Sequence, residues 1–143
     1  MKKIAIAADH AGYEYKEFAK KQLEGKYELV DFGTHGLDSV DYPDFVHPAA
    51  SAVENGDCEF GILFCVSGQG VQLSANKHQG IRCALAWMPE IAELSRQHNN
   101  CNMVAMPARF IAKELALEII EKFLATDFEG GRHQNRLDKI TCK

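Results

Sequence analysis

The sequence lacks the features that would place the protein in a membrane or on nucleic acid. No apolar run approaches the ~20 residues that a membrane-spanning helix needs. No block of cations is longer than Lys20-Lys21, and the net charge is −4, so the clustered positive charge typical of nucleic-acid binding is missing. The first apolar run ends at Asp9, too early for a secretory signal peptide. We therefore expect a cytoplasmic protein with neither a membrane nor a nucleic acid as a partner.

Paired cysteines are also missing. The five cysteines are odd in number and include no C-x-x-C pair, which argues against a disulfide framework and against a structural zinc site. We expect reduced thiols, at least four of them buried as small apolar side chains, and no metal; they stand at positions 58, 65, 83, 101 and 142.

What the chain does contain is a regular alternation of short apolar runs and helical segments. A length of 143 residues suits one domain, 1–143, and no internal repeat interrupts it. The alternation predicts βαβ units and a parallel sheet covered on both faces, an α/β fold. The expected strands are 2–8, 27–32, 60–65, 81–87 and 102–106, and the expected helices are 13–23, 45–53, 71–77, 88–97 and 109–124.

The stretch at 61–71 carries the strongest functional signal. An apolar run ends at Cys65 and passes through a glycine-containing loop, 66–70, into a helix. This pattern places Cys65 and Ser67 at the carboxyl edge of the sheet, with backbone N–H groups free to hold an anion. The loop lacks a third glycine and a Gly-Lys-Ser/Thr sequence, so it is neither a dinucleotide fingerprint nor a Walker loop. Taken alone, Cys65 has a simpler interpretation as a buried, inert thiol.

Other polar residues are predicted to meet this loop. Asp9 and His10 follow the first strand, and segment 98–100 leads into the fifth; we expect both at the same sheet edge. Arg132 and Arg136 lie four residues apart, on one face of a short helix within a tail, 125–143, that we expect to dock on its own domain or on a second subunit. Each has a structural alternative: helix capping, dipole complementation or surface ion pairs.

Together these residue types indicate a phosphorylated substrate that is a carbon acid. Two arginines and an imidazole suit a phosphate dianion, and the N–H groups of the loop suit an oxyanion. Cys65 is then a base or nucleophile, and His98 moves a proton at a ring or carbonyl oxygen.

The ordered motifs of the chain resemble those of the type B ribose-5-phosphate isomerases and their galactose- and allose-phosphate relatives. They run from residue 1 to about 140: I-A-x-A-A-D-H-A-G-Y near the start, D-Y-P-D at 41–44, C-V-S-G-Q-G at 65–70, S-A-N-K at 74–77, G-I-R at 80–82, L-S-R-Q-H-N at 94–99 and E-G-G-R-H-Q-x-R at 129–136. The resemblance implies a three-layer, Rossmann-like α/β/α sandwich with five parallel strands. It also implies a homodimer or dimer of dimers with shared active sites, and a cofactor-free aldose–ketose isomerisation through a cis-enediolate.

The resemblance also assigns roles to the matching residues. Cys65 is the base that moves the proton between C1 and C2, His98 opens the sugar ring, and Asp9 assists at the sugar hydroxyls. The anion hole and Ser67 contact the substrate, Asn99 binds the sugar, and four cationic residues hold the phosphate, some from the neighbouring subunit. The anion hole comprises Val66, Ser67, Gly68, Gln69 and Gly70, and the phosphate ligands are His10, Arg109, Arg132 and Arg136.

Two departures from the family pattern bear on the substrate. Val66 stands where the family loop often has glycine, which matters if the position needs a positive φ. The segment Trp87-Met88-Pro89 is bulky for a residue run beside a sugar. The preferred hypothesis is a ribose 5-phosphate isomerase. The alternatives are an isomerase of allose or galactose 6-phosphate, a non-catalytic sugar-phosphate-binding module, and a cysteine-nucleophile hydrolase.

Overall fold

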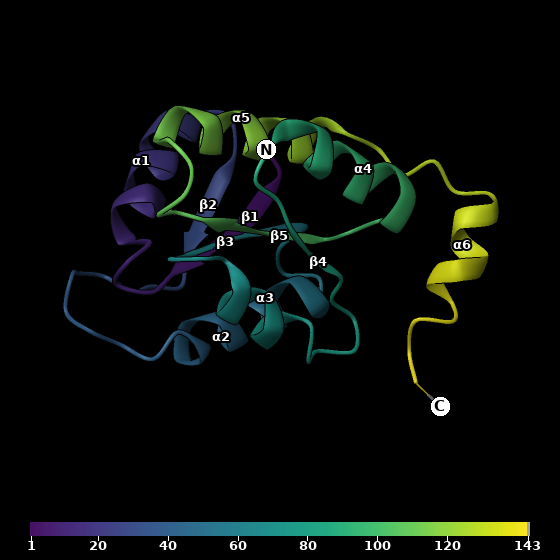
Figure 1. Ribbon diagram of the computed structural model, residues 1–143, viewed down its shortest axis with the longest axis horizontal. Coiled ribbons are helices and arrows are strands. Elements are labelled where there is room, and N and C mark those ends of the chain that lie inside the picture. The colour runs from purple at the N-terminus through teal and green to yellow at the C-terminus, as the bar shows by residue number, and fades with distance from the viewer. Residues whose placement is uncertain (143) are drawn as a thin grey trace.

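A five-stranded parallel sheet lies between two layers of helices in the computed structural model, which describes residues 1–142 (Figure 1). Residue 143, the end of the expected tail, lies outside the described residues. In chain order the elements are β1 (Lys3–Ala8), α1 (Tyr13–Leu23), β2 (Glu28–Asp31), α2 (Pro43–Glu54), β3 (Phe60–Cys65), α3 (Gln69–Ala75), β4 (Cys83–Leu85), α4 (Pro89–Asn99), β5 (Met103–Pro107), α5 (Lys113–Ala125) and α6 (Arg132–Leu137).

The strand order is β2-β1-β3-β5-β4, and every neighbouring pair is parallel. The connections leave β1 and β3 in opposite directions across the sheet, so the carboxyl ends of these two strands flank the position where ligands bind in open α/β sheets. Strand β5 lies beside β3, with Cys65 in register with Pro107. The predicted α/β/α sandwich is therefore confirmed.

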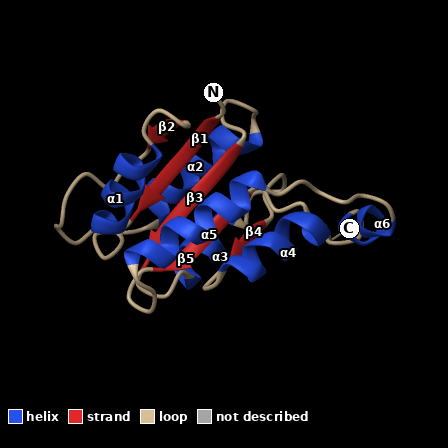
Figure 2. Ribbon diagram, turned by 90° about the horizontal axis from the view of Figure 1, so that it is seen from above, coloured by secondary structure: helices blue, strands red, loops and turns tan. Residues whose placement is uncertain are grey.

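Alternating side chains on the strands build one core on each face of the sheet. Ile4 and Ile6 of β1 pack in the core beneath α1, α4 and α5, whereas Ala5 and Ala7 face α2 and α3. Figures 1 and 2 show these two helical layers on either side of the strands. Cys65 belongs to the α2/α3 side.

A buried lysine fastens α1 to the edge strand β2. Lys16 is fully buried, and its Nζ lies 2.7 Å from Asp31 Oδ2 and 2.8 Å from Glu17 Oε2. Lys20 Nζ also lies 2.7 Å from Asp31 Oδ2. Burial disfavours the charged carboxylate, but hydrogen bonds from Lys16, Lys20 and the Gly33 N–H outweigh it and lower the pKa of Asp31.

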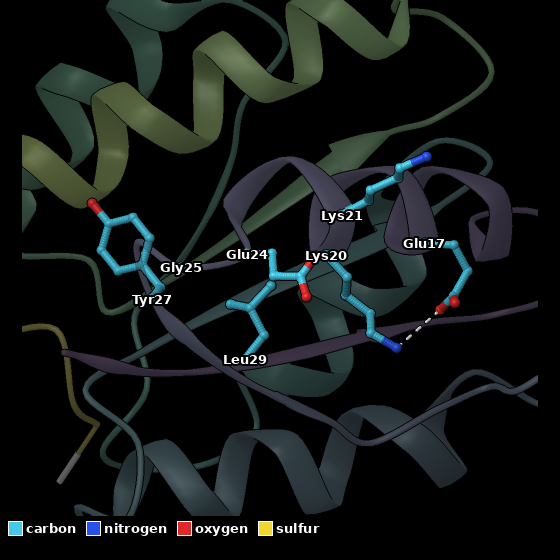
Figure 3. Close-up of a pocket in the computed structure, with 7 residues that line it drawn as sticks. All are labelled: Glu17, Lys20, Lys21, Glu24, Gly25, Tyr27 and Leu29. Atoms are coloured by element: carbon cyan, nitrogen blue, oxygen red, sulfur yellow. Dashed lines mark hydrogen bonds and ion pairs between the residues drawn. The ribbon is translucent and has the colours of Figure 1, made fainter.

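A hollow of about 380 Å³ lies next to this network, beside α1 and the start of β2 (Figure 3). Two lysines and two glutamates line it together with apolar side chains, so its charges balance. It lies at the amino end of β2, away from the sheet edge that carries Cys65. The lining residues are Glu17, Lys20, Lys21, Glu24, Gly25, Tyr27 and Leu29.

The expected helix at 109–124 begins four residues late, at Lys113. The N–H groups of Ala108 and Arg109 donate to the carbonyls of Cys65 and Val66, so this segment continues along the end of β3 rather than starting a helical turn. Phe110 is 71% exposed as a result, although the spacing of the expected helix would turn it toward the core. The other boundaries differ less: β4 is shorter than 81–87, and α3 starts two residues before 71.

The carboxyl-terminal tail forms the predicted short helix, α6, which stands away from the sandwich in Figure 1. Leu137 at its end is buried, and residues 137–142 share a cavity of about 340 Å³ with the 76–82 loop. The tail thus makes part of its contacts with its own chain. No helix within residues 1–142 is long and apolar enough to cross a membrane.

Candidate active site

Cys65 is the last residue of β3, and its side chain is only 5% exposed. The loop after it folds back so that the Gly68 N–H donates to Cys65 Sγ at 3.1 Å. Gly68 has a φ of 76° and is the N-cap residue of α3, and a β-carbon there would lie 2.5 Å from Leu85 Cδ1 and 3.1 Å from the Met106 carbonyl carbon. Only glycine suits both the backbone conformation and the space. The loop is therefore built to hold a donor against the sulfur.

Three backbone N–H groups of this loop have no acceptor among residues 1–142. They belong to Val66, Ser67 and Gly70, whereas the Gly68 and Gln69 N–H groups are used by Cys65 Sγ and Ser67 Oγ. Free N–H groups beside a thiol are the arrangement that stabilises an oxyanion. The anion hole predicted over 66–70 thus has unsatisfied donors at three of its five positions.

Val66 adopts an ordinary backbone conformation, because the one non-glycine residue with positive φ in the described chain is Asn100. The valine that replaces the usual glycine of the family therefore causes no backbone strain. Its side chain is 37% exposed and lines a hollow of about 340 Å³ with Ala11, Ala108 and Arg109. Arg109 follows β5, and its exposed side chain lies at the same edge as the loop.

Asp9 and His10 follow β1 at this edge, as predicted. Asp9 is 7% exposed, and its Oδ1 accepts the N–H groups of Ala11 and Gly12 at 3.0 and 3.1 Å. This contact satisfies the turn before α1, and Oδ2 makes no hydrogen bond within residues 1–142. His10 Nδ1 accepts the Val40 N–H at 3.2 Å, so Nε2 carries the ring proton and can donate.

Tyr42 is a site residue that our sequence reasoning did not identify. Its ring lies directly on Gly70, where a β-carbon would come within 2.8 Å of the phenolic oxygen. The hydroxyl therefore stands at the start of α3, beside the free Gly70 N–H. The motif D-Y-P-D at 41–44 was the available signal.

His98 and Asn99 lie at the amino edge of the sheet, where the strands begin, whereas Cys65 lies at the carboxyl edge, where they end. This corrects our expectation that 98–100 joins the Cys65 loop. They end α4, and the chain then enters the amino end of β5 at Met103. In the register of β3 and β5, Met103 pairs with Gly61, and Pro107 pairs with Cys65. The four residue-to-residue steps between these two pairs span about 13 Å. One chain thus holds no Cys65–His98 pair, which also removes the basis for a cysteine hydrolase within one chain.

A buried arginine fixes the end of α4 that carries His98. Arg96 donates to the carbonyls of Thr126 and Cys101 and to Asn100 Oδ1, at 3.0, 2.6 and 2.9 Å. Its guanidinium also lies 4.8 Å from the centre of the Phe60 ring. The last turn of α4 is therefore rigidly placed.

Two further residues accompany His98, and our sequence reasoning assigned them no role. The rings of His98 and His133 stack with centroids 4.4 Å apart, and Glu129 Oε1 lies 3.9 and 3.5 Å from their Nε2 atoms. Arg132 and Arg136 share α6 with His133; both are exposed, and neither makes an ion pair within residues 1–142. The predicted residues thus form two groups at opposite edges of the sheet.

The remaining cysteines behave as packing residues. Burial raises the pKa of Cys101 to about 11 and that of Cys83 well above its usual value, and it also raises the pKa of Cys58. All five thiols are free, and Cys142 is exposed. The expectation of four buried, unpaired thiols is confirmed.

Comparisons with known proteins agree with this fold and these motifs over nearly the full chain. Residues 4–140 match the family model described as Ribose/Galactose Isomerase. The ribose-5-phosphate isomerase B of Escherichia coli K12 is 42% identical over 143 residues, covering 99% of this chain and 96% of the relative. A ribose 5-phosphate isomerase structure from Thermotoga maritima superposes with a TM-score of 0.94 at 47% identity, covering 96% of each chain. The Mycoplasma genitalium ribose-5-phosphate isomerase B, solved with bound ribulose-5-phosphate, gives a TM-score of 0.92 at 41% identity, covering 96% of this chain and 93% of that one.

Proposed function

Because this chain belongs to the ribose/galactose isomerase family, we propose that it interconverts ribose 5-phosphate and ribulose 5-phosphate. The observation that carries the proposal is the Cys65 loop, where a buried thiol stands among three N–H groups that have no acceptor within residues 1–142. An aldose–ketose isomerase needs a base at C2 and donors for the oxygen of the enediolate, and this loop supplies both.

In the proposed reaction, Cys65 as thiolate removes the proton from C2 of the open-chain aldose. The electrons of the C–H bond form the C1–C2 double bond, and the carbonyl electrons move to O1, which gives a cis-enediolate whose oxyanion accepts hydrogen bonds from the N–H groups of Val66, Ser67 and Gly70. The hydroxyl proton on O2 then moves to O1. Cys65 returns its proton to C1 while the electrons on O2 form the C2 carbonyl, which yields the ketose. Donation from the Gly68 N–H at 3.1 Å gives the sulfur a partner while it is negatively charged.

The residues around the loop bind the sugar and its phosphate. Asp9 is placed to accept from sugar hydroxyls through Oδ2, and the Ser67 hydroxyl lies next to the free N–H groups. His10 donates from Nε2, and Arg109 adds a positive charge at the same edge. Gln69 starts α3, and its exposed side chain faces solvent at the loop.

We further propose that the working enzyme is a homodimer whose active sites are shared. In one chain, His98, Asn99, Arg132 and Arg136 lie at the sheet edge opposite Cys65, so a site that uses both groups takes the second group from a partner. His98 of the partner subunit then opens the sugar ring, Asn99 of the partner subunit binds the sugar, and the two arginines of α6 hold the phosphate. Dimers can pair further into tetramers without changing this arrangement.

Exposed apolar side chains at the Cys65 edge support such a partner. Val66, Phe110 and Trp87 follow β3, β5 and β4, three neighbouring strands, and are 37%, 71% and 50% exposed. A row of large apolar side chains beside an otherwise polar site is typical of an interface.

The free cysteines support a cytoplasmic location, where thiols stay reduced.

The family name includes galactose, so an isomerase of allose or galactose 6-phosphate is the second candidate. A substrate panel without added metal distinguishes the two. We expect kcat/KM to be highest for ribose 5-phosphate; a higher value for a six-carbon phosphate transfers the proposal to that sugar. Activity with none of them leaves a non-catalytic binding module.

A further inference from the structure

We propose that His98, Glu129 and His133 form a binding site for a divalent transition-metal ion such as Zn²⁺, and that the bound ion inhibits the enzyme. The inhibition rests on the function proposed above, whereas the binding does not. Two imidazoles and one carboxylate are a donor set that suits zinc and its neighbours rather than Mg²⁺ or Ca²⁺.

The distances between the donor atoms suit a shared ion better than hydrogen bonds. Glu129 Oε1 lies 3.5 Å from His133 Nε2 and 3.9 Å from His98 Nε2, and all three donor atoms lie within 4.8 Å of one another. Ligands around a tetrahedral zinc ion lie about 3.4 Å apart, as bonds of 2.0–2.2 Å require. The rings stack 13° from parallel, so their in-plane lone pairs lie side by side, and the two side chains must rotate about their χ angles before both Nε2 atoms point at one ion.

The backbone around the cluster is held in place while the side chains stay accessible. The Glu129 N–H donates to the Gln97 carbonyl at 3.0 Å, which fastens the loop to the end of α4. Gly130 and Gly131, with φ of 73° and 61°, then turn the chain into α6, whose first turn carries His133. The side chains of His98 and Glu129 are 43% and 51% exposed, whereas that of His133 is 12% exposed, so an ion reaches the cluster from the side of His98 and Glu129.

The bound ion would act on the enzyme in two ways. It would occupy Nε2 of His98, the side chain that is proposed to open the sugar ring. It would also link α4 to α6 and so fix Arg132 and Arg136, which need to adjust to a phosphate. Inhibition should therefore be reversible, with activity restored when a chelator removes the ion.

Calorimetric titration of the full chain with ZnCl₂, in a Cys142→Ser background that removes the exposed thiol, tests the binding directly. We expect one ion per chain, and at least ~10-fold weaker binding in Glu129→Gln and in His133→Gln. His47→Gln is the matched control, because His47 pairs with His78 elsewhere on the surface, at 2.9 Å, and should leave the affinity unchanged. Equal binding in all variants, or none in the parent, overturns the proposal.

Co²⁺ as a spectroscopic probe adds a second readout. We expect visible d–d bands without the near-ultraviolet charge-transfer band of a cobalt–thiolate bond; that band would mean coordination by cysteine and would overturn the site. Activity is measured separately, with and without EDTA. A chain that binds zinc through the three residues and yet isomerises no sugar phosphate in EDTA refutes the function but not the site.

Discussion

Mixing two inactive variants should restore activity if the active site is shared between subunits. Cys65→Ala removes the proposed base, and His98→Asn removes the ring-opening group at the other sheet edge. Each variant alone should retain about 1% of wild-type activity or less, because general acid–base catalysis contributes 10²–10⁴-fold. In a mixed dimer, one site receives both defects and the other receives neither, because the two residues of each chain serve different sites.

Random pairing of the two variants in the proposed dimer gives the size of the recovery. When equal amounts of the two variants are unfolded together and refolded, half of the dimers are mixed, and one of their two sites is intact. Activity should therefore reach about one quarter of wild type. It is followed as the conversion of ribose 5-phosphate to ribulose 5-phosphate.

A second mixture is the control. Cys65→Ala mixed with Asp9→Asn should show no recovery, because Asp9 and Cys65 lie at the same sheet edge and every mixed site keeps one defect. Asparagine at position 9 retains the oxygen that accepts from Ala11 and Gly12, so the fold should be preserved. Recovery in the control mixture, or none in the first, would refute the shared site.

Three further predictions concern the fold, the other thiols and the Cys65 loop. Lys16→Met should cost about 2 kcal/mol in urea unfolding at pH 7, less than the 3–5 kcal/mol of a fully broken buried pair because Asp31 keeps Lys20. The pKa of Asp31 is lowered in the folded state, so this carboxylate stabilises the fold above its unfolded pKa and ceases to do so as the pH falls through its folded pKa. The difference in unfolding free energy between wild type and Lys16→Met should therefore shrink in acid. A difference that does not change with pH would contradict this. Iodoacetamide at pH 8 should label the exposed Cys142 first, as read by mass spectrometry. Cys101, with a pKa of about 11, holds about 100-fold less thiolate than an ordinary cysteine and should react slowly. Equal labelling of the two would refute the burial of Cys101. Gly68→Ala should lower kcat/KM at least ~10-fold, since a β-carbon meets Leu85 and the Met106 backbone and moves the N–H donors; unchanged kinetics would mean that the loop tolerates the shift.

The sequence predicts those helices and strands whose spacing of apolar residues fits only one type of secondary structure. The helix from Tyr13 to Leu23 and the strand from Phe60 to Cys65 begin and end where we expected them. The helix start near Arg109 could not be predicted in this way, because Phe110 and Ile111 continue the helical spacing. Hydrogen bonds to the carbonyls of Cys65 and Val66 decide that boundary, and these bonds depend on β5 lying next to β3.

Among the site residues too, the sequence places some correctly and misses those that depend on contacts between distant segments. The Cys65 loop and Asp9 were placed correctly because residues after parallel strands meet at one edge. The same rule, applied strictly, places His98 at the other edge, since segment 98–100 precedes its strand rather than following it. Tyr42, Glu129 and His133 were missed because their positions depend on packing between distant segments.

The most direct test of the central claim follows a proton. Ribose 5-phosphate is incubated with the enzyme in D₂O, and nuclear magnetic resonance measures both the ribulose 5-phosphate formed and the deuterium at C1 and C2. The wild type should form the ketose and introduce deuterium at these carbons, and Cys65→Ala should lower both rates at least ~100-fold. Wild-type protein that neither forms the ketose nor exchanges the proton, or a Cys65→Ala variant as fast as wild type, would contradict the account.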